Sequence, residues 1–210
     1  MQQTLPAVMR ATWTDLTVEH HGVGLFRGFS YAVPDGMVIG VVGASSAALD
    51  VALRALAGRF TPVRGTVVIT GAPASVAVVG ATTGPDRPDP LQRVREAVSE
   101  VSRVPQGSTG RAFAEWSLTA AGLADLGDRL VGDLTVAERV RLGLALAASA
   151  GASVIVLDIS AAAADPTAAE LMVLLRQLAN GGRLVIVGAP TAHEAMDVVL
   201  PVPAPMEVLS

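Results

Sequence analysis

Apolar and polar positions divide the chain into short buried runs separated by polar or glycine-rich breaks. Runs of strand length cover 13–18, 29–33, 38–42, 66–69, 76–79, 154–157 and 184–187. The runs Val38–Val42 and Val154–Leu157 are continuously apolar, as expected of strands buried on both faces of a parallel sheet. The first two runs are expected to be antiparallel and partly exposed. The pattern therefore predicts an α/β fold with a mostly parallel sheet and an antiparallel flank.

Helical patterns fill much of the remaining chain. Helices are expected at 51–58, from 90 to about 101, at 111–123, at 136–148 and at 191–196. Asp89 is predicted to cap the second of these, with Pro90 as its first residue. The charge-free run 142–157 is 16 residues long, which is short of the roughly 20 residues that span a bilayer. Because small residues at 149–153 interrupt it, the run predicts a helix, a turn and a strand. We expect an α/β core of 1–81 and 139–210 and a helical subdomain of 82–138.

Composition narrows the functions that this fold could carry. The chain has no cysteine, three histidines without metal-ligand spacing and a net charge of −4, which argues against disulfides, thiolate metal sites and a nucleic-acid groove. No basic segment followed by an apolar core opens the sequence, so we expect no signal peptide and a cytoplasmic location.

The segment Met37–Asp50 has the outline of a phosphate-binding loop: a buried strand, a loop of small residues and a helix. Such a loop needs glycines for backbone approach, a lysine at the phosphates and a Ser or Thr at Mg²⁺. Here Leu49 and Asp50 stand in the last two places, and all 15 basic residues of the chain are arginine.

Later segments make this outline specific. From about Trp13 to its end, the chain resembles the ATP-binding subunit of an ABC transporter in the order of its segments. The segments that carry the resemblance are 37–71, Val154–Asp158, Ala163–Pro166 and Leu184–Gly188. The resemblance implies a P-loop NTPase-like fold, ATP and Mg²⁺ as ligands, and a position on the inner face of the membrane. It also implies docking of the helical subdomain on a transmembrane subunit, with 83–90 as the coupling surface.

The loop departs from the pattern GxxGxGK[ST] of this family. Gly43 matches, whereas Ser46 and Ala48 replace glycines, Leu49 the lysine and Asp50 the hydroxyl residue. The lost cation removes a contact worth about 1.5–3 kcal/mol. Asp50 repels phosphate and is expected to satisfy the vacant helix end. A degenerate phosphate loop (Gly43, Ser45, Ser46, Ala48, Leu49, Asp50) and a plain strand–turn–helix capped by Ser45 or Ser46 describe the same residues.

Other motif positions of the family are changed as well. Asp158 remains at a strand end as a candidate Mg²⁺ ligand or as a cap of the next turn, but Ile159 stands where the catalytic glutamate is expected. Thr135 keeps a hydroxyl at the signature segment, where Thr135 and Glu138 also form a capping box. The positions of the family's glutamine and switch histidine hold Ala81 and Ala189, and a surface position is expected for His193.

Two further segments take part in the resemblance. His20 and His21 fall where the family has an adenine-stacking aromatic, although an exposed turn before Gly22 explains them equally. Asp165 and Pro166 match the segment through which two ATP-binding subunits face each other.

These residues predict a degenerate, non-hydrolytic ATP-binding-type subunit of an ABC transporter, with no catalytic residue and no tightly bound cofactor. Its expected partners are a transmembrane subunit and a second, different ATP-binding subunit, and not nucleic acid. Two alternatives stay open: an ATPase rescued within its complex, with Asp158 holding Mg²⁺, and a free-standing regulatory or ligand-binding module.

Overall fold

The computed structural model describes residues 9–44, 46–70, 76–79, 88–102, 110–165 and 168–203. The strands are β1 (Met9–His20), β2 (Val23–Pro34), β3 (Val38–Val42), β4 (Arg64–Ile69), β5 (Val76–Val79), β6 (Val154–Asp158), β7 (Leu184–Ala189) and β8 (Val198–Pro201). The α-helices are α1 (Ser46–Leu56), α2 (Val94–Ser102), α3 (Gly110–Ala120), α4 (Val136–Ser149) and α5 (Ala168–Asn180). Short 3₁₀ turns are η2 (Ala124–Leu126), η3 (Val131–Asp133) and η4 (Ser160–Ala162).

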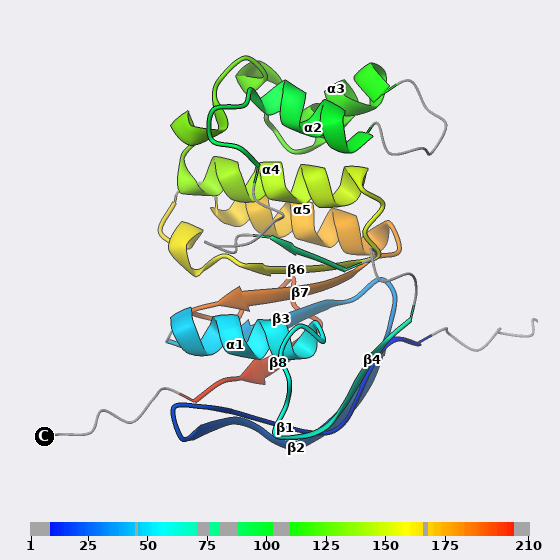
Figure 1. Ribbon diagram of the computed structural model, residues 1–210, viewed down its shortest axis with the longest axis vertical. Helices are drawn as coiled ribbons and strands as arrows, with labels where there is room; N and C mark the ends of the chain where they lie inside the picture. Colours follow the sequence, from blue (N-terminus) through cyan, green and yellow to red (C-terminus); the bar gives the residue numbers. More distant parts are fainter. Residues whose placement is uncertain are drawn as a thin grey trace, which may run out of the picture.

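The strands form two sheets. A parallel sheet has the order β5-β6-β7-β3-β8, and an antiparallel sheet has the order β2-β1-β4. Figure 1 shows α1 between the two sheets, α4 and α5 on the opposite face of the parallel sheet, and α2 and α3 beyond α4. The α/β class with a mostly parallel sheet, an antiparallel flank and a helical layer is therefore confirmed.

Both faces of the parallel sheet are buried, which explains its continuous apolar runs. On one face, Ile39 and Ile186 join a core with α1 and the antiparallel sheet. On the other, Val38 and Val185 pack with α4 and α5. Because alternate residues of a strand point to opposite faces, both core clusters draw on the same strands.

A third apolar cluster holds α2 and α3 against α4. Val94, Val98 and Leu118 meet Leu142 in this cluster, while Leu144 of the same helix belongs to the core over the sheet. Because α4 contributes to both clusters, the packing alone does not separate residues 82–138 from the α/β core. The predicted boundary of the helical subdomain stays a prediction.

The antiparallel sheet bends sharply along one line. Asp15, Gly28 and Gly65 on its three strands all have positive φ, and the pairing of β1 shifts between Trp13 and Leu16. A Cβ on Gly65 would come within 2.3 Å of the Asp15 carbonyl oxygen, so only glycine allows this approach. The bend is seen in Figure 1, where β1 and β2 curve around α1.

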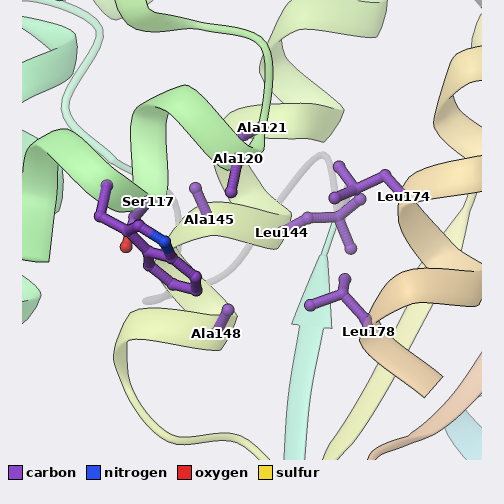
Figure 2. Close-up of a pocket in the computed structure, with 9 residues that line it drawn as sticks. Ser117, Ala120, Ala121, Leu144, Ala145, Ala148, Leu174 and Leu178 are labelled. Carbon is purple, nitrogen blue, oxygen red and sulfur yellow. The ribbon is translucent and has the colours of Figure 1, made fainter. Parts of the chain in front are cut away.

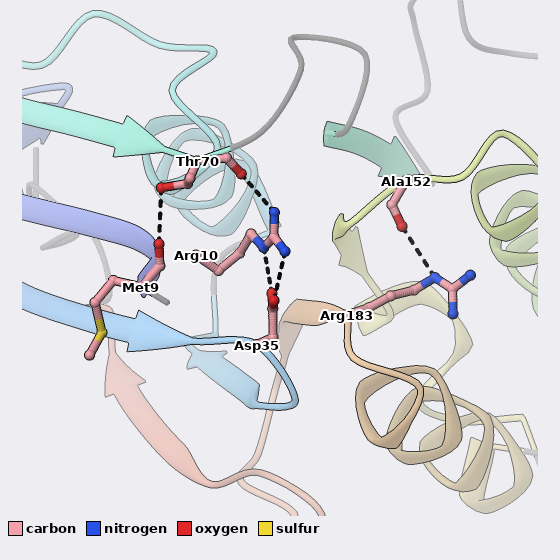
Figure 3. Close-up of polar contacts among 6 residues, drawn as sticks. All are labelled: Met9, Arg10, Asp35, Thr70, Ala152 and Arg183. Atoms are coloured by element: carbon pink, nitrogen blue, oxygen red, sulfur yellow. Dashed lines mark hydrogen bonds and ion pairs between the residues drawn. The ribbon is translucent and has the colours of Figure 1, made fainter. Parts of the chain in front are cut away.

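Arg10 ties the ends of these strands together, as Figure 3 shows. Its guanidinium forms a two-pronged ion pair with Asp35 and donates to the Thr70 carbonyl at 2.8 Å. The hydrogen bond that Arg10 donates to Asp35, the largest effect, raises the pKa of Arg10, although burial opposes it. The next residue, Gly36, donates its amide to the Arg183 carbonyl, which joins this corner to the start of β7.

Several predicted helix boundaries are wrong, among them the start of α1, which lies at Ser46 and not at Val51. The helix expected from Pro90 begins only at Val94, because residues before it pair with the chain around Gly132: Val131 N donates to Gln92 O, and Gly132 N to Pro90 O. Asp89 instead caps a turn by accepting from Leu91 N at 2.9 Å.

Residues 191–196 form turns where a helix was expected, and the following strand β8 was not predicted. Met196 packs on β3 over Gly40, where any Cβ would collide with its sulfur. This contact fixes the segment against the sheet and overrides its helical pattern.

A small apolar hollow of roughly 40 Å³ lies where α3, α4 and α5 meet (Figure 2). Trp116, Leu144, Leu174 and Leu178 are among its lining residues, and Trp116 is 63% exposed. Among the described residues, no helix has the length and apolar character needed to cross a membrane.

Candidate functional site

The candidate site lies at the carboxyl ends of β3, β6 and β7, where ligands of open α/β sheets bind. Gly43 N donates to Ala189 O at 3.2 Å, and Ile159 N donates to Gly188 O at 2.9 Å. These bonds bring the three family segments that follow these strands to one edge. The loop after β3 and the turns after β6 and β7 therefore lie side by side.

Leu49 turns its side chain into the core beneath the loop. It is fully buried and lies 3.7 Å from a Cβ built on Gly43. Val202, which follows β8, closes the same region: its carbonyl oxygen lies 3.0 Å from that Cβ, and its amide donates to Val42 O at 2.7 Å. Ala48 is buried beside Leu49, Ser46 is exposed, and Ser45 lies outside the described residues.

Asp50 does not satisfy the helix end as expected. Because α1 begins at Ser46, Asp50 is its fifth residue, and no acidic residue lies in the first turn. Both carboxylate oxygens instead accept from Arg54 Nε, at 2.8 and 3.0 Å. The spacing of four residues between Asp50 and Arg54 is typical of helix ion pairs and is a signal for this contact in the sequence.

Asp158 caps the turn that follows β6. Its Oδ1 accepts from Ser160 N at 2.8 Å and faces Gly188 of β7. A cap of the next turn was one of the two roles expected for Asp158, the other being a Mg²⁺ ligand. Ile159, at the expected position of a catalytic glutamate, is 5% exposed and packs in the core over α5.

Thr135 and Glu138 form the predicted capping box at the start of α4. Thr135 Oγ1 accepts from Glu138 N at 3.2 Å, and Glu138 Oε2 accepts from Thr135 N at 2.7 Å. Arg129 adds an ion pair to Glu138 at 3.7 Å. The carboxylate thus lies at the positive end of the helix dipole, with its own cation nearby.

The remaining motif positions are scattered. Ala189 is buried at the end of β7, whereas His193 is exposed as expected, with Nδ1 accepting from Ala195 N. His20 ends β1 and is half-buried, whereas His21 begins the exposed turn of the β1–β2 hairpin. Ala81, Pro166 and residues 83–87 of the predicted coupling surface lie outside the described residues.

Val202 and Arg176 help to shape this edge of the sheet and were not predicted from the sequence. Arg176 of α5 binds Asp197 at 2.9 Å, and Asp197 also accepts from Val38 N at 2.8 Å, which anchors β8 beside β3. Burial, the largest effect, opposes ionisation of Asp197, but these hydrogen bonds together outweigh it and lower its pKa. No local pattern marks either residue, because both act through contacts distant in sequence.

The side chains at this edge give it limited chemistry. Within the described part of the chain, no group of three or more His, Cys, Asp or Glu residues is placed to hold a metal ion. Asp158 is a polar side chain of the kind found in a Mg²⁺ site, but it already accepts from Ser160 N.

The chain is similar in sequence to known ATP-binding proteins. It is 29% identical to the cobalamin import ATP-binding protein BtuD of Halobacterium salinarum over 84% of this chain and 47% of that protein. It is also 29% identical to the cytochrome c biogenesis ATP-binding export protein CcmA of Roseobacter denitrificans, over 85% of this chain and 83% of that protein. The chain thus spans about half the length of the first relative. No protein-family model matches it.

The fold is shared with solved structures. CbiO1 from Clostridium perfringens, part of the ABC transporter complex cbiONQ, superimposes with a TM-score of 0.71 at 17% identity, over 92% of this chain and 84% of that one. The relatives and this structure support the resemblance to an ABC transporter ATP-binding domain, and the chain has the fold of that domain.

Proposed function

We propose that this chain is an ATP-binding-type subunit of an ABC transporter that neither hydrolyses ATP nor binds Mg-ATP tightly, and that it acts beside a second ATP-binding subunit. One observation carries the proposal. The positions at which the resemblance places the phosphate cation, the catalytic base and the switch histidine hold Leu49, Ile159 and Ala189, which are all buried apolar side chains.

The loop offers a triphosphate little electrostatic stabilisation. A lost charge-assisted contact costs about 1.5–3 kcal/mol, or roughly ten- to a hundredfold in affinity. Leu49 cannot supply such a contact, and the carboxylate of Asp50 adds repulsion that its partner Arg54 offsets only in part. These residues do not fit ATP and Mg²⁺.

Hydrolysis also needs a group that orients or deprotonates the attacking water. Ile159 has no polar side-chain atom. Asp158, the nearest carboxylate in sequence, already caps Ser160 N. The site lacks the base as well as the cation, and repair of either one alone leaves the other defect.

The start of α4 is closed to a second anion. By resemblance, this segment would face the phosphates bound to a partner subunit. Here Glu138 already occupies the helix end and is bonded to the Thr135 amide. A phosphate approaching the same end would meet a carboxylate, so a composite site with a partner's loop would be impaired.

These defects favour an asymmetric assembly. Two copies of this chain would contain no competent site, whereas a competent partner would supply its own loop, base and histidine. Asp165 and its neighbours are proposed as the pairing segment, and the helical subdomain with 83–90 as the surface that docks on a transmembrane subunit at the inner face of the membrane.

Nucleotide chemistry is tested on the purified chain. Calorimetric titration with Mg-ATP should show no binding at micromolar affinity, and a phosphate-release assay should show no turnover. Turnover that is abolished by Asp158→Asn would overturn the proposal, because it would assign hydrolysis to this site.

Assembly is tested by purification of the tagged chain from membranes of its native cells. We expect a polytopic membrane protein and a second ATP-binding subunit to co-purify. Charge reversal at Asp86, Arg87 and Asp89 should weaken recovery of the membrane protein, whereas reversal at Glu19 and Arg27, exposed on the antiparallel sheet, should not. Recovery of a soluble monomer alone would contradict the transporter role.

A further inference from the structure

We propose that Arg141 is a positioning residue that sets the geometry of the pairing face, by which we mean the start of α4 at Thr135 and the turn at Asp165. This inference rests on the proposed function. That function places both segments at the partner. The two segments are distant in sequence, so their relative position depends on the packing of η4 and α5 against α4.

One ion pair lies within two turns of both segments. Arg141, six residues into α4 from its cap, binds Glu170 in the first turn of α5, with Nη2 2.6 Å from Oε2. The start of α5 is in turn joined to the turn before it, because Ala168 N donates to Asp165 O at 2.9 Å. The Arg141–Glu170 pair therefore links α4 to the segment that carries Asp165.

The burial of Arg141 distinguishes this pair from ordinary surface pairs. Its side chain is 12% exposed, whereas that of Glu170 is 70% exposed. Its Nη1 also lies 3.4 Å from a Cβ built on Gly122, in the turn that ends α3. A largely buried arginine side chain that contacts both α5 and the turn after α3 has few alternative positions, which makes it suited to hold the two pairing segments in one arrangement.

The test measures affinity for the partner subunit. The second subunit that co-purifies with the wild-type chain is purified separately, and its dissociation constant is measured for wild type, Glu170→Gln, Arg141→Met and Arg141→Lys. We expect about tenfold weaker pairing for Glu170→Gln and Arg141→Met, and partial rescue by Arg141→Lys. Glu170→Gln changes an exposed side chain, so it remains informative if Arg141→Met fails to fold.

The exposed pair Arg95–Asp128, with side chains 55% and 73% exposed, is the matched control, and Arg95→Met should leave pairing unchanged. Wild-type affinity in Glu170→Gln would overturn this inference alone. An equal loss of pairing in Arg95→Met would also overturn it, because the effect would then be general. If the wild-type chain pairs with no second subunit, the proposed function itself fails, and this inference with it.

Discussion

Leu49 shows most clearly how a single side chain can change the character of a loop. Its position favours lysine in a phosphate loop, but here the side chain is fully buried against the core that includes Val202. A lysine at this place would have to leave the core or bury its ammonium. We therefore expect Leu49→Lys to lower the free energy of unfolding by about 2–5 kcal/mol without creating ATP binding.

Urea denaturation and titration with Mg-ATP measure the two effects separately. Leu49→Met is the matched control, because it preserves apolar volume and should cost less than about 1.5 kcal/mol. A Leu49→Lys variant that is as stable as wild type, or that turns over ATP, would show that the loop still has room for a cation.

The identities of the site residues could be predicted from sequence better than their contacts. The absence of lysine and the apolar residues at 49, 159 and 189 are visible in the letters alone. The predicted role of Asp50 at the helix end was wrong, because α1 begins earlier than its apolar pattern indicates. Val202 closes the loop from a segment about 160 residues away, and no local pattern encodes such a contact.

Among the elements, α4 is specified locally from its first residue. Its capping box is written in the sequence and is present in the structure. Thr135→Ala removes the acceptor for Glu138 N and should cost about 1 kcal/mol, measured as a lower urea midpoint. Thr135→Ser keeps the hydroxyl and should stay close to wild type; equal midpoints for the alanine and serine variants would argue against the cap.

Strand β8 has the opposite character, because tertiary contacts define it. The bounds of β3 and β5 follow directly from their apolar runs, but β8 follows a segment with a helical pattern and was missed. It is held by Asp197, which accepts from Val38 N and binds Arg176. Sequence reasoning finds elements whose own pattern suffices and fails where a distant partner decides.

The Asp197 contacts predict a dependence of stability on pH. Its pKa is lowered from 3.8, so its stabilisation is complete above that pH and is lost as the pH falls through the lower folded-state pKa. Asp197→Asn should reduce the free energy of unfolding by about 0.2–1 kcal/mol at pH 7, since the pair is partly exposed. Urea denaturation from pH 7 to pH 3 should show this difference shrinking below pH 4; a constant difference would exclude the ion pair as its cause.

At the scale of the whole molecule, apolar packing accounts for the stability of the fold. Two cores enclose the parallel sheet, and buried apolar residues contribute to them at the positions where the resemblance places the phosphate cation, the catalytic base and the switch histidine. Stability should therefore not depend on a bound nucleotide. A ligand at 100 times its dissociation constant adds about 2.7 kcal/mol, which for a chain of this size raises Tm by roughly 5–11 °C.

We accordingly expect about 1 mM Mg-ATP to leave Tm unchanged, whereas a site with a dissociation constant of about 10 µM would give that full shift. Mg²⁺ without nucleotide is the control for ionic effects. The measurement also separates the open alternatives. A Tm shift seen only in the purified complex comes either from nucleotide bound to the partner or from a site that assembly completes. Introducing Asp158→Asn into this chain distinguishes these two sources. Loss of the shift would place the nucleotide at this chain's loop and contradict the proposed function, whereas an unchanged shift would assign ATP to the partner.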